Sequence, residues 1–265
     1  MNTFSTSAYR SFKAFVGELT ATSVGIYVAV EEAIPTVDAL NASDRWSVVA
    51  GRHGVKVSGL SSERVRQSTV RLILVSLYSG FDLFVSDLRG QHNHLHGKAW
   101  IQHDGDAPFQ ALARNTPSLI SVHEARLGLD RIATLNYYRL ARNAVAHPRQ
   151  EAVAAATAFF SSNQASLESV KEQYKLRSAP NSVQDINIHD IRFLARIALD
   201  VAKAVDQDFD PGDVRLATLL PRVISKTPKS VQRARSEQIG WIRTNFGVSA
   251  KRAALIVDEA LDSSA

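Results

Sequence analysis

Cysteine is absent from the 265 residues of this chain. Its absence excludes disulfide bonds, a thiolate nucleophile and any zinc site with cysteine ligands, and it is typical of a cytoplasmic protein, which is the location we expect. Residues 1–16 lack the basic-then-apolar pattern of a secretory signal. No run of eighteen or more apolar residues occurs, so we expect no helix that spans a membrane.

Several familiar catalytic motifs are also missing. The sequence has no P-loop, no dinucleotide-binding fingerprint and no Ser–His–Asp spacing, so nothing supports a kinase, a dehydrogenase or a hydrolase of those types. No alternating strand of useful length occurs either, whereas apolar residues recur at helical spacing. With an apolar fraction of 45%, the chain can form a globular core. We therefore predict an all-α fold, a helical bundle with N- and C-terminal helical additions.

Turn-forming and helix-ending residues divide the sequence into three predicted parts. An N-terminal helical segment and loop cover residues 1–60, a helical domain covers 61–206, and a basic helical appendage covers 207–265, after the turn "DFDPGD". The helices expected in them, with their limits, are 8–33 ending near Pro35, 61–89 ending at Gly90, 118–127, 130–147, 151–176, one beginning after Asn187 as N-cap, and two after Pro228 separated by Gly247 and Ser249. Residues 41–60 and 91–116 are expected to be loops.

Positive charge is concentrated near the C-terminus. The chain carries a net charge of +5, yet the span from Arg215 to Arg252 holds nine basic residues and one acid, so the remainder is net negative, at −3. The first interpretation is a surface for a polyanion such as RNA, with Arg233 and Arg235 as candidate contacts; the alternative is a solvated surface that aids solubility. The stretch "TNFGVSAKRAA" has the outline of a helix-turn-helix, which offers a third, DNA-binding interpretation.

The stretch "LARNAVAHPRQ", residues 140–150, places polar groups at the end of a predicted helix. Arg139, Asn143 and His147 are spaced i, i+4, i+8 and so share one face, with Arg142 beside them. Pro148 disfavours helical geometry at the histidine, so we expect the imidazole to be held at the helix end, outside the core.

These residue types suit chemistry on a phosphodiester. An arginine can grip phosphate oxygens and stabilise the charge of the transition state, and an imidazole transfers protons near neutral pH. In RNA the 2′-hydroxyl is the nucleophile, so neither a metal nor a serine or cysteine is needed. Arg149 adds a candidate RNA contact. The alternative is structural: such a cluster can simply cap carbonyls and pair with acids.

The motif and its surroundings resemble the HEPN family. "RNAVAH" fits the R-x4-6-H motif of these domains, including a polar residue after the arginine. The helix "LVSLYSGFDLFVSDL" before it carries an acid, Asp82, as is usual in the family, and the helix "INIHDIRFLARIALDVAKAV" follows it. The resemblance covers roughly residues 61–206, and the order of the three helices makes it more specific than the short motif alone.

The resemblance implies a metal-independent endoribonuclease that works as a homodimer without a cofactor, with two motifs facing one composite cleft. Many family members are toxins, phage-defence effectors or RNA-processing enzymes, so an antitoxin or defence protein is an expected partner. His147 would be the acid/base residue, Arg142 would hold the phosphate, and Asn143 would orient the histidine or substrate, while Asp82 and Arg139 would support them. The product would be a 2′,3′-cyclic phosphate. The alternative is a catalytically silent module that binds RNA or a partner protein.

A second group of histidines comes from the predicted loop 91–116, namely His92, His94, His96 and His103. Alternating histidines can ligate zinc or nickel, but no acidic ligand stands at a fixed spacing, so we expect no metal site. These histidines and Trp100 are otherwise candidates for the border of an RNA cleft.

Overall fold

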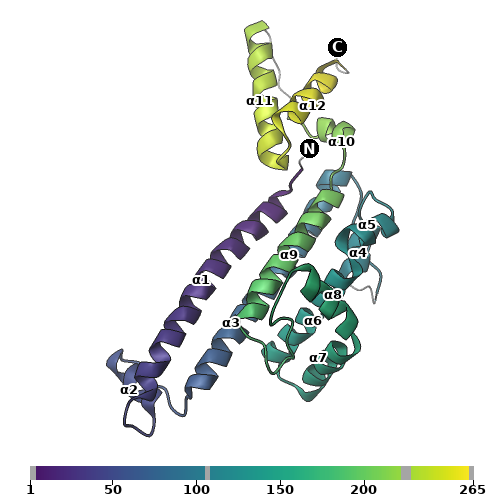
Figure 1. The fold of residues 1–265 in the computed structure, drawn as a ribbon. Coiled ribbons are helices and arrows are strands. Elements are labelled where there is room, and N and C mark those ends of the chain that lie inside the picture. Colours follow the sequence, from purple (N-terminus) through teal and green to yellow (C-terminus); the bar gives the residue numbers. More distant parts are fainter. Residues whose placement is uncertain (1–3, 105–107, 222–227, 263–265) are drawn as a thin grey trace. The chain divides into compact units, whose positions relative to one another are not determined.

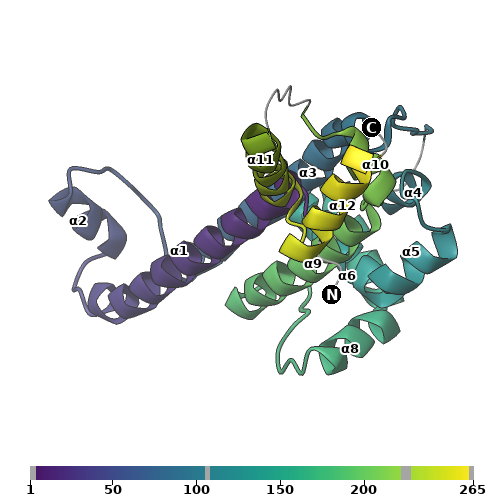
Figure 2. The same cartoon turned by 90° about the horizontal axis from the view of Figure 1, so that it is seen from above.

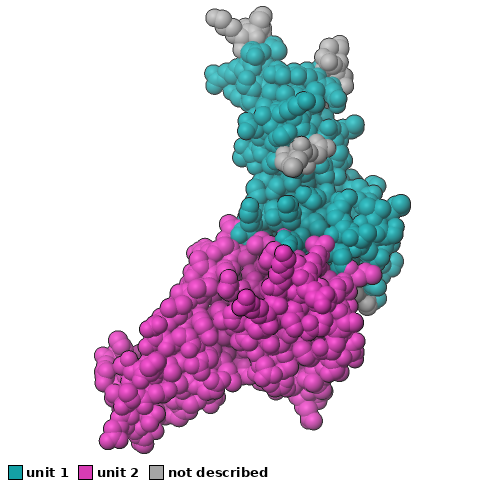
Figure 3. Space-filling view, in the orientation of Figure 1, with its two compact units in different colours: residues 1–13, 82–128, 200–265 teal, residues 14–81, 129–199 magenta. Residues whose placement is uncertain are grey.

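The computed structural model describes residues 4–104, 108–221 and 228–262, and helices are the only regular elements in these ranges (Figure 1). The prediction of an all-α class is confirmed. The chain divides into two compact units, coloured separately in Figure 3. Unit 1 holds residues 1–13, 82–128 and 200–265, and unit 2 holds residues 14–81 and 129–199. The helices are α1 (Ser7–Asp38), α2 (Arg45–Arg52), α3 (Ser62–His96), α4 (Pro108–Arg114), α5 (Ile120–Leu127), α6 (Leu129–Ala146), α7 (Gln150–Ser162), α8 (Gln164–Gln173), α9 (Ile188–Asp208), α10 (Asp213–Thr218), α11 (Pro228–Phe246) and α12 (Ala250–Asp262).

The units do not coincide with the three parts predicted from the sequence. Helices α1, α3 and α9 each contribute residues to both units. The predicted domain of residues 61–206 is therefore divided between them, and residues 207–265 share unit 1 with residues 82–128.

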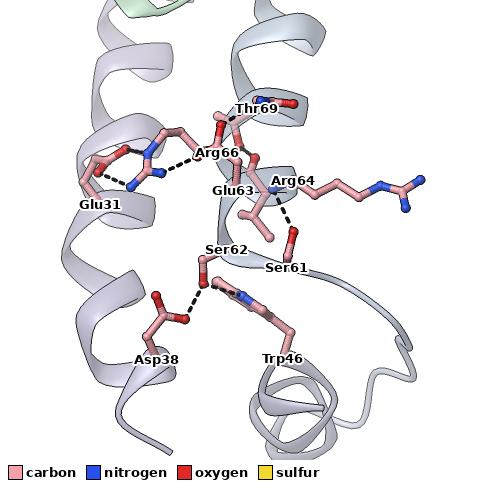
Figure 4. A network of polar contacts seen from close by, with 11 residues as sticks. Glu31, Asp38, Trp46, Ser61, Ser62, Glu63, Arg64, Arg66 and Thr69 are labelled. Atoms are coloured by element: carbon pink, nitrogen blue, oxygen red, sulfur yellow. Dashed lines mark hydrogen bonds and ion pairs between the residues drawn. The ribbon is translucent and has the colours of Figure 1, made fainter. Parts of the chain in front are cut away.

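In unit 2, α1 and α3 lie side by side and the segment with α2 connects them (Figures 1 and 2). Arg66 on α3 holds Glu31 on α1 with two parallel contacts, Nε–Oε1 at 2.6 Å and Nη2–Oε2 at 3.0 Å (Figure 4). Near the helix ends, the hydroxyl of Ser62 donates to Asp38 at 2.7 Å and accepts the Trp46 indole N–H at 3.1 Å. These contacts fix the register of α3 against α1 and dock α2 beside the start of α3.

Helix α6 is the centre of the remaining part of unit 2. Its side chains Leu135, Tyr137, Tyr138 and Ala141 are fully buried. Helical spacing places Ile132, Leu135, Tyr137, Leu140, Ala141 and Ala144 on inward faces; four of these are buried, and Ile132 and Leu140 are half-buried. The Tyr137 ring lies 5.1 Å from that of Phe160 on α7. Residue Tyr138 donates its hydroxyl hydrogen to a carboxylate oxygen of Asp190 on α9 at 2.8 Å.

The start of α9 is capped as the sequence predicts. The Asn187 side-chain oxygen accepts the His189 backbone N–H at 2.9 Å, and the Asp190 carboxylate accepts the Asn187 backbone N–H at 3.0 Å. The first contact is an N-cap bond to the second helical N–H, and the second is the return contact of a capping box. Asp190 is fully buried and also accepts the backbone N–H and side-chain amide of Asn181, at 2.9 and 2.8 Å. One carboxylate thus ties the loop before α9 to α6 and α9.

In unit 1, α11 and α12 form a helical pair. Gly247, with a φ of +59°, ends α11, and the Ser249 hydroxyl accepts the Arg252 backbone N–H at 3.2 Å to cap α12. Both predictions for this turn are confirmed. The N-terminal segment is joined to it, since Ser5 donates its backbone N–H to the Phe246 carbonyl at 2.8 Å. A Cβ at position 247 would approach the Ser5 Cβ to 2.9 Å, so glycine is required there for space as well as for conformation.

Several predicted elements differ from the helices in the structure. Helix α3 runs through Gly90 to His96, helices α2 and α4 lie in predicted loops, and α1 continues past Pro35. A glycine inside a helix costs only about 1 kcal/mol, and burial of Leu88, His92 and Leu95 on α3 offsets that cost. The predicted helix 151–176 is two helices, because Asn163 adopts a non-helical conformation and its side-chain amide donates to the Phe159 carbonyl at 2.9 Å.

Among the described residues, two helices are long and apolar enough to cross a membrane by length and composition alone, although neither contains an uninterrupted run of eighteen apolar residues. They are α1 and α3, and 11% and 39% of their most apolar windows are buried inside the protein. Core helices of soluble proteins meet the same criterion, so it does not place the chain in a membrane. Part of α1 exposes apolar side chains, including Ile26 and Val28, which are 49% and 50% exposed.

Candidate functional site

The polar end of α6 lies outside the core, as predicted. Helix α6 ends at Ala146, one residue before His147 and two before Pro148. The His147 backbone N–H still donates to the Asn143 carbonyl at 2.9 Å, so the last helical turn positions this residue. The imidazole is exposed. A rigid helix therefore presents the histidine to solvent, which a group that transfers protons to a substrate requires.

Three of the residues selected from the sequence meet in one pocket. Asn143, His147 and Arg149 line an open pocket of about 680 Å³ in unit 2, together with Glu151 and Ala152 from the start of α7. Sequence analysis missed Glu151. The available signal was an acid in the first turn of the helix that follows the motif. The pocket combines a cation, an imidazole, an amide and a carboxylate, a set that can bind an anion and move protons.

Arg142 does not line this pocket. Its guanidinium carbon lies 5.4 Å from the centre of the Tyr78 ring on α3, and Tyr78 itself is buried. The reason is helical geometry, because consecutive residues project about 100° apart around a helix of 3.6 residues per turn. The guanidinium is thus held by the aromatic face, half-buried and beside the pocket that contains Asn143 and His147.

The two supporting residues are also outside the pocket. Arg139 is half-buried, and its Nε is buried without a hydrogen-bond partner among the described residues. Of the three residues on the predicted face, Arg139, Asn143 and His147, only the last two therefore line the pocket. Asp82 is exposed on α3 and belongs to unit 1, whereas the motif belongs to unit 2.

Three arginines of the basic C-terminal region, Arg233, Arg235 and Arg252, form ion pairs with acids. Arg233 pairs with Glu237 at 2.9 Å, and Arg235 holds Asp258 with contacts of 2.6 and 2.8 Å. The hydrogen bond from Arg235 lowers the pKa of the Asp258 carboxyl below its usual value. Other members contribute similar contacts: Arg252 binds Asp210 and Asp213, and Arg215 donates to the carbonyls of His94 and Leu95. Arg222, Lys226 and the side chain of Lys229 lie outside the described residues.

A second cluster of cations was missed by sequence analysis. An open pocket of about 570 Å³ in unit 2, named here the basic pocket, is lined by Lys175, Leu176, Arg177, Ser178, Ala179, His189, Arg192, Phe193 and Arg196. The spacing of Arg192 and Arg196, one helical turn apart on α9, was a usable signal. The opposite wall belongs to the loop before α9, whose path depends on contacts distant in the sequence.

Two of the four histidines in residues 92–103, His92 and His96, form packing contacts, whereas His94 and His103 are exposed. Both ring nitrogens of His92 lie against backbone oxygens, 3.0 Å from Lys98 and 3.1 Å from Asn115. The ring also packs on those of His96 and Trp100, at 4.8 and 5.3 Å. Burial, followed by the nearby positive groups His92, Arg215 and Lys98, lowers the pKa of His96 to about 4. No group of metal-ligating side chains suited to an ion is found among the described residues.

A buried contact between a histidine and an aspartate in unit 1 is a further feature that sequence analysis did not identify. The ring of His123 is fully buried, and its Nδ1 lies 2.5 Å from a carboxylate oxygen of Asp208. Arg126 contacts the other oxygen of the same carboxylate. The contact between His123 and Asp208 joins α5 to α9, and neither the imidazole nor the carboxylate is accessible to a substrate.

Comparison of the chain with protein-family models, with curated proteins and with solved structures finds no match.

Proposed function

We propose that this protein is a metal-independent endoribonuclease of HEPN type that acts as a homodimer. The observation that carries the proposal is the pocket at the end of α6, where Asn143, His147 and Arg149 come together. The buried face of the same helix fixes the position of Asn143 and of the last turn before His147, and Arg149 stands at the N-cap of α7. In this proposal the substrate is RNA and the reaction needs no cofactor. The biological role is that of a toxin or a phage-defence effector.

His147 is the proton-transfer residue in this mechanism. The 2′-oxygen of the substrate attacks the adjacent phosphorus while a base removes its proton, and the bond from phosphorus to the 5′-oxygen breaks as an acid protonates that oxygen. The products are a 2′,3′-cyclic phosphate and a 5′-hydroxyl. Arg149 binds phosphate oxygens at the pocket, Asn143 orients the imidazole or the substrate, and Glu151 is a further proton acceptor.

A second copy of the chain completes the site. Arg142 and His147 do not line one pocket within a single chain. The proposal therefore pairs Arg142 of one copy with His147 of the other across a composite cleft. This arrangement supplies both the cation that stabilises the transition state and the proton-transfer group.

The direct test is cleavage of single-stranded RNA with EDTA present, comparing the wild type with His147→Ala. Removing an acid/base group reduces rates by about 100-fold or more, so we expect the variant to be inert while its circular dichroism and Tm are unchanged. His53→Ala is the matched control, because His53 is another exposed histidine of unit 2. Equal cleavage by both variants would contradict the proposal, as would products without cyclic phosphate ends.

The second candidate function is a catalytically silent module that binds RNA or a partner protein. The position of Arg142 favours it, because a guanidinium packed over Tyr78 stabilises the fold without reaching a substrate in one chain. This candidate predicts RNA binding that persists in wild type without any cleavage, under conditions in which the protein is dimeric.

A further inference from the structure

The basic pocket has two walls that come from one short segment of the chain. Lys175 and Arg177 lie on the loop that follows α8, and His189, Arg192 and Arg196 lie on the first turns of α9. The pocket lies in unit 2, the unit that also contains the end of α6. Its base is apolar, since Ala179 and Phe193 are 2% and 1% exposed.

The loop wall is held by buried polar contacts. Asp190 accepts hydrogen bonds from Tyr138, Asn181 and Asn187, and the Tyr137 hydroxyl donates to the Asn181 carbonyl. Because these groups are anchored in the core of unit 2, the position of the loop is set before any ligand arrives. Cations on a fixed loop lose less conformational entropy on binding than cations on a mobile one.

The charges of the basic pocket are not neutralised within the described chain. Of its lining residues, Lys175, Arg177, Arg192 and Arg196 are cations, His189 is titratable, and none is an acid. Their side chains make no hydrogen bond or ion pair with any described residue, whereas Arg66 in the same unit contacts Glu31 and Glu63. Arg196 makes a cation–π contact instead, since its guanidinium carbon lies 4.8 Å from the centre of the Tyr174 ring.

This cluster is unfavourable without an anion. Arg192 and Arg196 stand at i, i+4, where like charges destabilise a helix by about 0.2–0.5 kcal/mol. Asp190, two residues before Arg192, lies between the two walls in the sequence, but its carboxylate is fully buried and already accepts four hydrogen bonds. An anionic ligand would remove the repulsion, and the two arginines, separated by about 6 Å along the helix axis, can contact successive phosphates.

We propose that the basic pocket binds the phosphate backbone of single-stranded RNA and holds the strand on unit 2 while it is cleaved. This inference rests on the proposed ribonuclease function and names the surface that grips its substrate. The cations on both walls supply the phosphate contacts. Such contacts are indifferent to base sequence, so the pocket contributes affinity and leaves the choice of cleavage site to other groups.

Binding is tested without cleavage, by fluorescence anisotropy of a labelled single-stranded RNA in the His147→Ala background. Adding R192Q and R196Q is expected to raise Kd about tenfold or more at low salt. The slope of log Kd against log salt should fall by about 1.4, since each lost phosphate contact on a single strand contributes about 0.7. R192K with R196K should restore most of the affinity, because it restores the charge.

The matched control is R52Q with R64Q. Both arginines are exposed in unit 2, and Arg64 points away from the network drawn in Figure 4. Removing them changes the net charge by the same amount, so Kd should stay within about twofold of the parent and the salt slope should not change. A second pair, K175Q with R177Q, tests the loop wall and should weaken binding in the same direction as R192Q with R196Q.

The outcomes separate the two proposals. If R192Q with R196Q changes Kd and salt slope no more than the control pair, the inference is wrong even if the wild type cleaves RNA. Equally tight binding of duplex DNA through the same residues would overturn the assignment to single-stranded RNA. If the pocket variants lose binding as expected but no preparation cleaves RNA, the ribonuclease proposal fails and the binding site stands.

Discussion

Two cationic regions of this protein differ in their charge density along the sequence. The denser region is the one whose arginines are paired with acids in the structure. The C-terminal region from Arg215 to Arg252 has the densest positive charge, yet Arg233, Arg235 and Arg252 are bound to acids. The cations of the basic pocket are scattered over residues 175–196, and none of them is paired with a described acid. Charge density along the chain therefore does not measure the charge that is available to a ligand.

The difference comes from where the acids lie. In the C-terminal region, the partners Asp210, Asp213 and Asp258 approach from a turn and from neighbouring helices. Beside the basic pocket, Asp190 is turned into the core, where Tyr138, Asn181 and Asn187 use its oxygens. A buried acid that organises a loop thus leaves the surrounding cations for another partner.

The largest expected effect is that of Asp190→Ala, which removes the structural basis of the comparison. It leaves several buried donors without an acceptor, and each such loss costs about 1–3 kcal/mol, so we expect a loss of about 4 kcal/mol in unfolding free energy. The RNA affinity of the remaining folded protein should also fall. Urea denaturation measures the first effect and fluorescence anisotropy the second. Asp185→Ala, at an exposed acid of the same loop, should change neither quantity appreciably, and equal effects of both variants would refute the role given to Asp190.

Asp206 in unit 1 is a second buried carboxyl. It sharpens the comparison because fewer hydrogen-bond donors surround it than surround Asp190. Burial raises its pKa to about 7, although the backbone N–H and hydroxyl of Thr6 donate to it at 3.0 and 2.5 Å. The folded-state pKa lies above the unfolded value near 4, so the folded form binds the proton more tightly and stability is lost as the pH rises from about 4 to about 7.

Asp206→Asn should remove this loss and stabilise the protein by a few kcal/mol at pH 8, with little effect at pH 4. The measurement is Tm against pH for both proteins. His96 contributes the opposite slope between about pH 4 and 6.5, because its pKa is lowered to about 4, but that contribution cancels in the difference. A constant difference in Tm across this range would show that Asp206 is not the titrating group.

An intermediate effect is expected from Arg252→Met, at a paired cation of the C-terminal region. Arg252 is 6% exposed, and its acid partners retain partial contact with water. We therefore expect a loss of about 2 kcal/mol in stability, below the cost of breaking a fully buried pair, and no change in RNA affinity. Arg192→Gln should do the reverse, weakening RNA binding at unchanged stability. The comparison fails if both variants affect the same property.

The smallest effect is expected from R233Q with R235Q. Because these arginines are held in surface ion pairs, their removal should leave Tm unchanged within error and Kd for RNA within about twofold, despite the loss of two positive charges. Anisotropy at low salt, run beside R192Q with R196Q, measures this directly. A loss of affinity as large as that caused by R192Q with R196Q would indicate that the C-terminal region is an RNA-binding surface, contrary to the comparison.

Local signals explain what the sequence could predict. The inward face of α6, the Asn187 cap and the turn at Gly247 and Ser249 depend on residues within a few positions of each other, and all are confirmed. The joining of Asn143, His147 and Arg149 in one pocket also follows from helical spacing and the Pro148 stop.

Contacts between distant segments explain what it could not predict. The packing of Arg142 over Tyr78 joins α6 to α3. The wall of the basic pocket depends on Asp190, which accepts hydrogen bonds from Asn181 and Tyr138. The extension of α3 through Gly90 depends on burial of the residues after it. None of these features leaves a periodic trace in the sequence.

The measurement that tests the central proposal most directly is subunit mixing. His147→Ala and Arg142→Ala are purified separately, shown to be folded and inert on RNA in EDTA, and then mixed under conditions that exchange subunits. A site that pairs Arg142 of one copy with His147 of the other predicts that cleavage with cyclic phosphate ends returns in the mixture, which a contaminating nuclease would not reproduce. A mixture of exchanged dimers that stays inert while the wild type cleaves would contradict the composite site, and a wild type that never cleaves would contradict the ribonuclease itself.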